Sequence, residues 1–198
     1  MLGLPEMTEV SKQLPKKAIY AKFNMNTAQR EKFDADVSRI TIVNEVSSST
    51  VNIAAGETVK AFFVLHLALK RREYDERLIV QLSRLIDQNM IFVLEYEGEA
   101  QLAVYHQKVM CTGWRSTDEL QIRLNGLTLD AVWENIITQI GGIHIEGGHT
   151  LDEQLAIDEQ RAKLQKQIDR LEKLARIEKQ PRKKFEIVQK ISGLKKEL

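Results

Sequence analysis

Cysteine is almost absent from this 198-residue sequence, since Cys111 is the only one. A single cysteine can form neither an internal disulfide nor the multi-cysteine cluster of a structural zinc site. No apolar run approaches the roughly 18 residues that a membrane-spanning helix requires. Residues 1–12 also lack the basic and apolar segments of a secretory signal. We therefore expect a protein of the reducing cytoplasm that does not enter a membrane.

Motifs of the common nucleotide-binding and hydrolase sites are missing as well. Neither the pattern G-x-G-x-x-G nor the pattern G-x-x-x-x-G-K-[ST] occurs in the sequence. The G-x-S-x-G motif of a hydrolase nucleophile is also absent. We therefore predict no catalytic residue, no bound metal and no cofactor, and a function that is more typical of a binding protein than of an enzyme.

The composition that remains is that of a globular protein with an uneven charge distribution. Apolar residues make up 43% of the chain and charged residues 29%, which excludes disordered and collagen-like classes. The net charge is only +1, but residues 150–198 hold 13 Lys or Arg and 9 Asp or Glu, whereas the rest holds 16 and 19. The pattern indicates a mildly acidic body followed by a basic C-terminal quarter.

Hydrophobic periodicity predicts several strands in the body. Apolar residues lie on both faces of segment 58–70, as is typical of a central strand. The turn-forming residues 97–99 separate two β-prone segments, which indicates a hairpin. The predicted strands lie around residues 40–42 and at 50–54, 58–70, 90–96, 100–108 and 120–124.

Three helices are predicted in the same region, and residues 1–24 are expected to be a partly irregular lead-in. Asn26 and Gln29 have the spacing of a capping box, which predicts a helix over residues 28–37. Residues 75–88 and 129–140 carry apolar stripes of helical period, the second followed by Gly141 and Gly142. We therefore predict an α+β or α/β domain over residues 1–140, with a mixed β-sheet and flanking helices.

Residues 141–149, with the sequence GGIHIEGGH, contain four of the ten glycines of the chain. This density predicts a flexible joint between the globular domain and a helical arm at residues 150–198. His144, Glu146 and His149 within the joint offer ligand types that bind transition metals. Because a flexible joint does not hold ligands in place, we do not favour a metal site there.

Apolar residues of the arm recur at steps of three and four among charged residues, as in a short coiled-coil seam. Pro181 splits the pattern into two helices that can fold back as an antiparallel pair. The second repeat extends to Leu198. We predict that the seam binds a protein partner through Ile157, Leu164, Ile168, Leu171, Leu174, Ile187, Ile191 and Leu194.

Residues 170–196 carry ten basic and three acidic side chains, a net charge of +7. Such density can neutralise nucleic-acid phosphates, although a solvated coiled-coil face is the simpler alternative. Because Phe185 is the only aromatic residue of the arm, bases have no stacking platform there. Any DNA contact is therefore predicted at backbone phosphates, through Arg170, Lys173, Arg176, Lys179, Arg182, Lys183, Lys184 and Lys190.

Two weaker sets of residues lie in the body. Glu95, Glu97 and Glu99 flank the predicted hairpin turn, with Lys70 and Lys108 at the ends of neighbouring strands, as a metal-dependent nuclease would need. Solvated acids around a turn are the more common explanation. Cys111 with His106 resembles a nucleophile and a base, but both are predicted in or near the same strand without a third orienting group, so packing is favoured.

Several segments along the whole chain resemble the bacterial family catalogued as domain of unknown function 4391. They are residues 4–5, 52–59 (NIAAGETV), 92–98 (FVLEYEG), 118–120, 126–135 (GLTLDAVWEN), 178–180 and 194–198. The chain departs from the family pattern at Pro181 and at His66, where relatives often carry an acidic residue. The departure at His66 weakens a nuclease interpretation.

Members of this family tend to lie beside helicase and DNA methyltransferase genes of restriction-like antiphage systems. The resemblance implies an accessory role in such a complex and no catalytic residue. We therefore expect a non-enzymatic subunit that docks through its arm to a helicase or methyltransferase and can touch DNA. The alternatives are a divergent metal-dependent nuclease and a self-associating structural protein whose arm pairs with a second copy.

Overall fold

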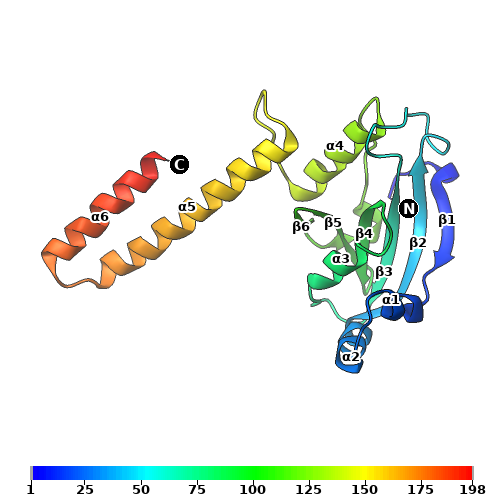
Figure 1. Cartoon of the computed structure of the whole chain (residues 1–198), viewed down its shortest axis with the longest axis horizontal. Coiled ribbons are helices and arrows are strands. Elements are labelled where there is room, and N and C mark those ends of the chain that lie inside the picture. Colours follow the sequence, from blue (N-terminus) through cyan, green and yellow to red (C-terminus); the bar gives the residue numbers. More distant parts are fainter. Residues whose placement is uncertain (1, 198) are drawn as a thin grey trace. The chain divides into compact units, whose positions relative to one another are not determined.

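The computed structural model of the protein describes residues 2–197 and consists of two compact units, residues 1–144 and 145–198 (Figure 1). The first unit has a mixed seven-stranded sheet with flanking helices, and the second is helical. The predicted fold class is therefore confirmed. The division between the units falls inside the glycine-rich segment 141–149, whose flexibility stays a prediction.

The sheet follows the order β1-β2-β3-β4-β5-β6, with the short β7 paired to β5. Among the strands of residues 2–197, the β3–β4 pair is parallel and the other pairs are antiparallel. Strand β3 is central and apolar on both faces, as predicted. The strands are β1 (Glu9–Gln13), β2 (Val37–Ser47), β3 (Ala61–Leu69), β4 (Asn89–Tyr96), β5 (Glu99–His106), β6 (Lys108–Cys111) and β7 (Arg115–Ser116).

One face of the sheet packs against three helices, α1 (Lys16–Lys22), α2 (Thr27–Asp36) and α3 (Arg77–Leu82). Each helix contributes buried apolar side chains to a single cluster, among them Ile19, Phe33 and Ile79. The capping box of Asn26 and Gln29 is confirmed at the start of α2. These helices and strands place one part of the core between the sheet and α1 to α3.

The other face is covered by α4 (Leu129–Gly141), whose predicted apolar stripe is entirely buried. Phe62 points to the opposite side of β3 from Phe63, because side chains alternate along a strand. The ring of Phe62 lies 5.5 Å from the ring of Trp133 on α4. Gly142 then ends the helix with φ 60°, a left-handed conformation that glycine adopts without strain.

Several sequence predictions for the body are wrong. Residues 2–24 are more regular than the predicted, partly irregular lead-in, since they form a short helical turn, η1 (Glu6–Thr8), then β1 and α1. The predicted helix at 75–88 is confined to α3, because the chain continues in tight turns in which the N–H of Leu85 bonds to the carbonyl of Leu82.

The predicted strands at 50–54 and 120–124 do not form. Residues 48–50 make a turn instead, in which the hydroxyl of Thr50 donates to the carbonyl of Glu45. Leu120 and Ile122 follow a short helical turn, η2 (Thr117–Glu119), and are buried although they form no strand. The alternating apolar positions in this segment therefore reflect burial of the two side chains by the surrounding chain and not a strand. Lys108, predicted in the hairpin, opens the next strand, β6.

The second unit contains two long helices, α5 (Leu151–Ile177) and α6 (Pro181–Lys196), as the sequence predicted. Pro181 is the first residue of α6, where its missing N–H costs nothing. The two helices pack against each other through a small apolar core that includes Ile168, Ala175 and Ile191. Leu198, the last step of the predicted repeat, lies outside the described residues.

Within residues 2–197, none of the helices combines the length and the apolar character needed to cross a membrane.

Candidate functional site

The start of α5 is fixed by its own capping box. The hydroxyl of Thr150 accepts a hydrogen bond from the N–H of Glu153 at 3.3 Å, and the carboxylate of Glu153 accepts one from the N–H of Thr150 at 2.8 Å. The bond from the Thr150 backbone is the main cause that lowers the pKa of Glu153. The helical unit therefore begins at a well-defined residue.

The segment before this cap is bonded to α5. The N–H of Glu146 donates to the side-chain oxygen of Gln154 at 3.1 Å, and the carboxylate of Glu146 pairs with Arg161 at 3.0 Å. Glu146 is thus engaged with α5 through both its backbone and its carboxylate. Within residues 2–197, no group of three His, Cys, Asp or Glu side chains is arranged to hold a metal.

The structure divides the predicted partner-binding residues into two groups. Five of them lie in the apolar core between α5 and α6. They are Ile168, Leu171, Ile187, Ile191 and Leu194. Ile168 and Ile191 are buried in this core, so contact with another protein through these two requires the hairpin to open, whereas the other three members of the core are only partly buried. The other three, Ile157, Leu164 and Leu174, lie outside this core, and partner binding through them stays a prediction.

The predicted nucleic-acid residues do not share one face of the hairpin. Arg182, Lys183 and Lys184 are consecutive on α6, so their side chains leave the helix about 100° apart. Arg182 lies 3.6 Å from Glu186 one turn away. The other seven predicted residues form no ion pair within the part of the chain that the structure describes. Phosphate contact stays a prediction, but the charge surrounds the hairpin.

The three carboxylates around the β4–β5 turn have separate surroundings. Glu95 on β4 pairs with the imidazole of His66 on the neighbouring strand β3. Glu97 lies in the turn with φ 49°, where its carboxylate is the main cause that raises the pKa of the adjacent Tyr96. Glu99 pairs with Arg72 at 2.9 Å. The predicted nuclease arrangement is therefore not assembled around one point.

Cys111 and His106 lie on different strands, β6 and β5, and Cys111 contacts Tyr74. The thiol sulfur lies 3.7 Å from the phenol oxygen of Tyr74, which also accepts a hydrogen bond from the amide of Gln101 at 3.1 Å. Burial is the largest cause that raises the pKa of Tyr74 far above its ordinary value. This environment supports a packing role for Cys111.

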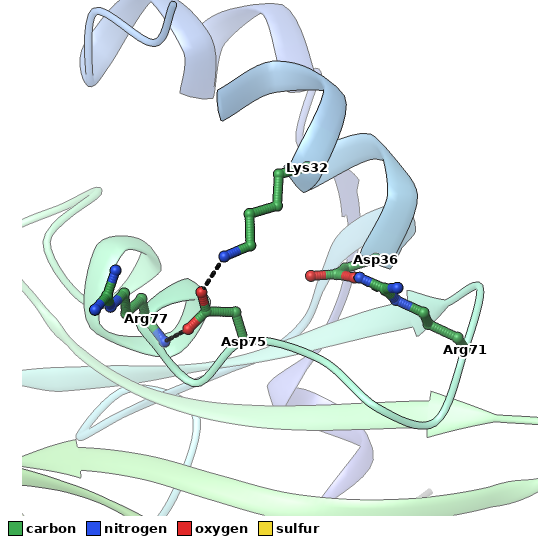
Figure 2. A network of polar contacts seen from close by, with 5 residues as sticks. All are labelled: Lys32, Asp36, Arg71, Asp75 and Arg77. Atoms are coloured by element: carbon green, nitrogen blue, oxygen red, sulfur yellow. Dashed lines mark hydrogen bonds and ion pairs between the residues drawn. The ribbon is translucent and has the colours of Figure 1, made fainter. Parts of the chain in front are cut away.

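A network of ion pairs that sequence reasoning missed joins α2 to the segment before α3 (Figure 2). Lys32 donates to Asp75 at 2.5 Å, and the other oxygen of Asp75 accepts from the N–H of Arg77 at 3.0 Å. Asp36, almost fully buried, accepts from the Nε of Arg71 at 2.6 Å. The partners are 35 and 43 residues apart, so no local pattern predicts them.

A cavity of about 150 Å³ lies beside this network. Its walls combine apolar side chains, such as Phe33 and Leu78, with Lys32 and Asp36. The two acids of the network are already paired with basic residues (Figure 2). The arrangement fastens α2 to the segment between β3 and α3 and leaves no set of groups directed at a ligand.

A second missed feature connects two segments that both carry the family resemblance. Asp130, in the first turn of α4, accepts hydrogen bonds from the N–H groups of Glu57 and Val59 and from the hydroxyl of Thr58. The segments 52–59 and 126–135 thus meet at a single carboxylate. The resemblance of both segments to the same family was the sequence signal that could have predicted this contact. Because the Asp130 carboxylate is saturated with donors, it acts as a structural link.

Comparison with known proteins gives one match. The model of the family described as domain of unknown function (DUF4391) matches residues 2–198. No curated protein and no solved structure matches the chain. The family match covers nearly the whole chain, including both compact units, and agrees with the resemblance seen in the sequence. The chain belongs to the DUF4391 family.

Proposed function

We propose that this protein is a non-enzymatic accessory subunit that binds a protein partner through the helical unit 145–198. The observation that carries the proposal is the construction of this unit. Its two helices form a hairpin with its own small apolar core, while many of its other side chains are charged and exposed. A hairpin of this kind presents a long surface for binding.

The body supports a binding role more than a catalytic one. Glu95 and Glu99 are paired with His66 and Arg72, and Asp130 is saturated by backbone and hydroxyl donors. A hydrolytic metal site would need several such ligands directed at one point. These acids are therefore not grouped as the ligands of a catalytic metal, so their geometry does not favour the nuclease alternative.

The partner that we propose is a helicase or DNA methyltransferase of a restriction-like antiphage complex. This part of the proposal rests on the gene neighbourhood that the family resemblance implies. Contact of the basic hairpin with DNA held by such a partner is compatible with its charge. The proposal describes a subunit that contributes binding surface to a DNA-acting assembly.

Hydrogen exchange of the full chain, with and without a purified neighbouring helicase or methyltransferase, tests the proposal. We expect one of these proteins to bind and to slow amide exchange within residues 145–197. Protection confined to residues 2–144 would show that the body makes the contact and would contradict the proposal. Absence of binding to both proteins would contradict it as well.

A further inference from the structure

A cavity of about 340 Å³ lies within the body, where α4, β5 and residues 115–123 meet. Its volume falls in the range of about 300–1,000 Å³ that is typical of small-molecule sites. Much of the lining is aliphatic and comes from side chains that are almost fully buried, so the deeper wall is apolar. These side chains are Leu102, Leu120, Ile122, Ile136 and Ile140.

The segment that forms one wall of the cavity is fastened on several sides. The side-chain amide of Gln139 on α4 donates to the carbonyl of Arg123 at 3.0 Å and accepts from its N–H at 3.2 Å. The N–H of Ile122 donates to the carbonyl of Leu2 at 2.9 Å. At the start of the segment, Arg115 on β7 is paired with β5. The wall is therefore set before any ligand binds, which lowers the cost of binding.

Two arginines and one acid supply the charged groups of the lining. Arg115 and Arg123 are exposed, and within residues 2–197 their guanidinium groups form no ion pair or hydrogen bond. With Glu119, the lining holds two positive charges and one negative charge, a net of +1. A guanidinium can bind an anionic group through two parallel hydrogen bonds. The cavity thus combines an aliphatic wall with unpaired donors for an anion.

These features favour a monocarboxylate over other occupants. A phosphate ester carries a charge of about −1.5 to −2 at neutral pH, which exceeds the net charge of the lining. A metal ion would meet a single carboxylate beside two guanidinium groups. The described residues that line the cavity include no aromatic ring, so a nucleobase has nothing to stack on. A carboxylate with an aliphatic body matches both the charge and the apolar wall.

We propose that this cavity binds a small aliphatic carboxylate. Arg115 and Arg123 bind the carboxylate, and the aliphatic body lies against the buried apolar side chains, where it loses contact with water. Glu119 disfavours ligands with a second negative charge. The carboxylate belongs either to a free organic acid or to the end of a peptide whose last residue is aliphatic. The inference goes beyond the proposed function and does not depend on it, because it concerns the body alone.

Titration of the full-length chain, followed in ¹H–¹⁵N NMR spectra, tests the inference. The probes are octanoate as a free acid, N-acetyl-leucine as a chain end, octyl phosphate and octanol. We expect at least one of the two carboxylates to shift the amide signals of residues 115–123, with a Kd of about 1 mM or lower. Octyl phosphate and octanol should bind more weakly than this carboxylate, because one carries too much charge and the other carries none.

Substitutions then separate the cavity from general charge effects. Arg115→Gln and Arg123→Gln should each weaken binding of the carboxylate about tenfold, because each removes a charge-assisted hydrogen bond. Glu119→Gln should strengthen its binding about threefold, since a repelling charge is lost. Arg84→Gln is the matched control, because Arg84 is exposed on the body and does not line the cavity. Circular dichroism of each variant verifies that the fold is kept.

Each result supports or overturns the inference. Binding that both arginine variants weaken and the control leaves unchanged supports it, and the tighter of the two carboxylates identifies a free acid or a chain end as the source. Absence of shifts at about 10 mM of either carboxylate would overturn it. Tighter binding of octyl phosphate, equal binding of octanol, or equal weakening by Arg84→Gln would overturn it as well. All of these results leave the proposed function standing, since no partner protein takes part.

Discussion

The carboxylate of Asp130 accepts a 2.7 Å hydrogen bond from the backbone N–H of Val59, a residue 71 positions earlier in the chain. The same carboxylate accepts bonds from the N–H of Glu57 at 2.6 Å and from the hydroxyl of Thr58 at 2.8 Å. It lies in the first turn of α4, where a negative charge is also favoured by the helix dipole. One side chain therefore fixes the loop before β3 to the helix that covers the sheet.

Replacing Asp130 by Asn should lower the melting temperature of the protein by a few degrees. Asparagine keeps one acceptor oxygen, and its NH2 group cannot accept from the N–H groups of the loop. Differential scanning calorimetry at neutral pH measures the change. Asp118→Asn, at an exposed acid elsewhere in the body, is the matched control and should leave the melting temperature unchanged. An equal effect of both substitutions would contradict the role of Asp130.

The effect of Asp130→Asn should depend on pH. The hydrogen bond from Val59, followed by that from the hydroxyl of Thr58, lowers the pKa of Asp130 below its ordinary value of 3.8. Since the folded-state pKa is the lower one, the stabilisation is fully present above the unfolded-state pKa and disappears as pH falls through the folded-state pKa. The stability difference between wild type and variant should be complete at about pH 7 and shrink below about pH 4. A difference that stays constant over this range would exclude charge as the cause.

Gly56→Ala should destabilise the same contact from the other side. A Cβ at Gly56 would overlap the carboxylate of Asp130, so either the loop or the side chain must shift. Gly113→Ala is the matched control, because a Cβ there would meet no atom within 4 Å. We expect a lower denaturation midpoint in urea for Gly56→Ala and a midpoint near that of wild type for Gly113→Ala. Equal midpoints for the two variants would show that the loop accommodates the methyl group.

The parts of the fold that could be predicted from sequence are those with a local signal. Helix α4 carries its whole apolar stripe within 13 residues, and β3 is apolar on both faces, so each pattern identifies its element. Strand β1 has all five residues exposed, and α1 buries only Ile19. Neither has an apolar period, because each is held by pairing or packing with residues far along the chain.

The same limit applies to the candidate site. Pro181 and the apolar steps around it predicted two helices, which the structure confirms. Sequence reasoning assigned the apolar steps both to an antiparallel helix pair and to a protein partner, and the structure places Ile168 and Ile191 in the hairpin core. An amphipathic helix buries the same apolar face whether it packs against the second helix of its own hairpin or against another protein. Periodicity alone therefore does not distinguish the two. The exposed Ile177 and Phe185 break the repeat and become visible only in the structure.

Ile168→Ala should destabilise the hairpin selectively. Ile168 is 1% exposed in the core between α5 and α6, and removal of such a side chain costs about 2–5 kcal/mol. Hydrogen exchange should become faster within residues 151–196 and stay unchanged in the sheet. Leu174→Ala, at a position 43% exposed, should change exchange little. Faster exchange in the sheet as well would show that the two units unfold together.

The two ion pairs that fasten α2 should contribute unequally to stability, although they lie close together in Figure 2. The Asp36 side chain is 4% exposed and bonded to Arg71, whereas the Lys32 and Asp75 side chains are 59% and 29% exposed. Loss of a buried charge-assisted bond costs about 1–3 kcal/mol, whereas an exposed pair contributes about 0–1 kcal/mol.

We therefore expect Asp36→Asn to lower the free energy of unfolding, measured in urea, by about 1–3 kcal/mol, and Lys32→Gln to lower it by less than about 1 kcal/mol. Arg71→Gln should resemble Asp36→Asn, because it leaves the buried carboxylate without its partner. If Lys32→Gln proved the more damaging change, the exposed pair would be the one that holds α2 in place, and burial of Asp36 would not determine the strength of its bond.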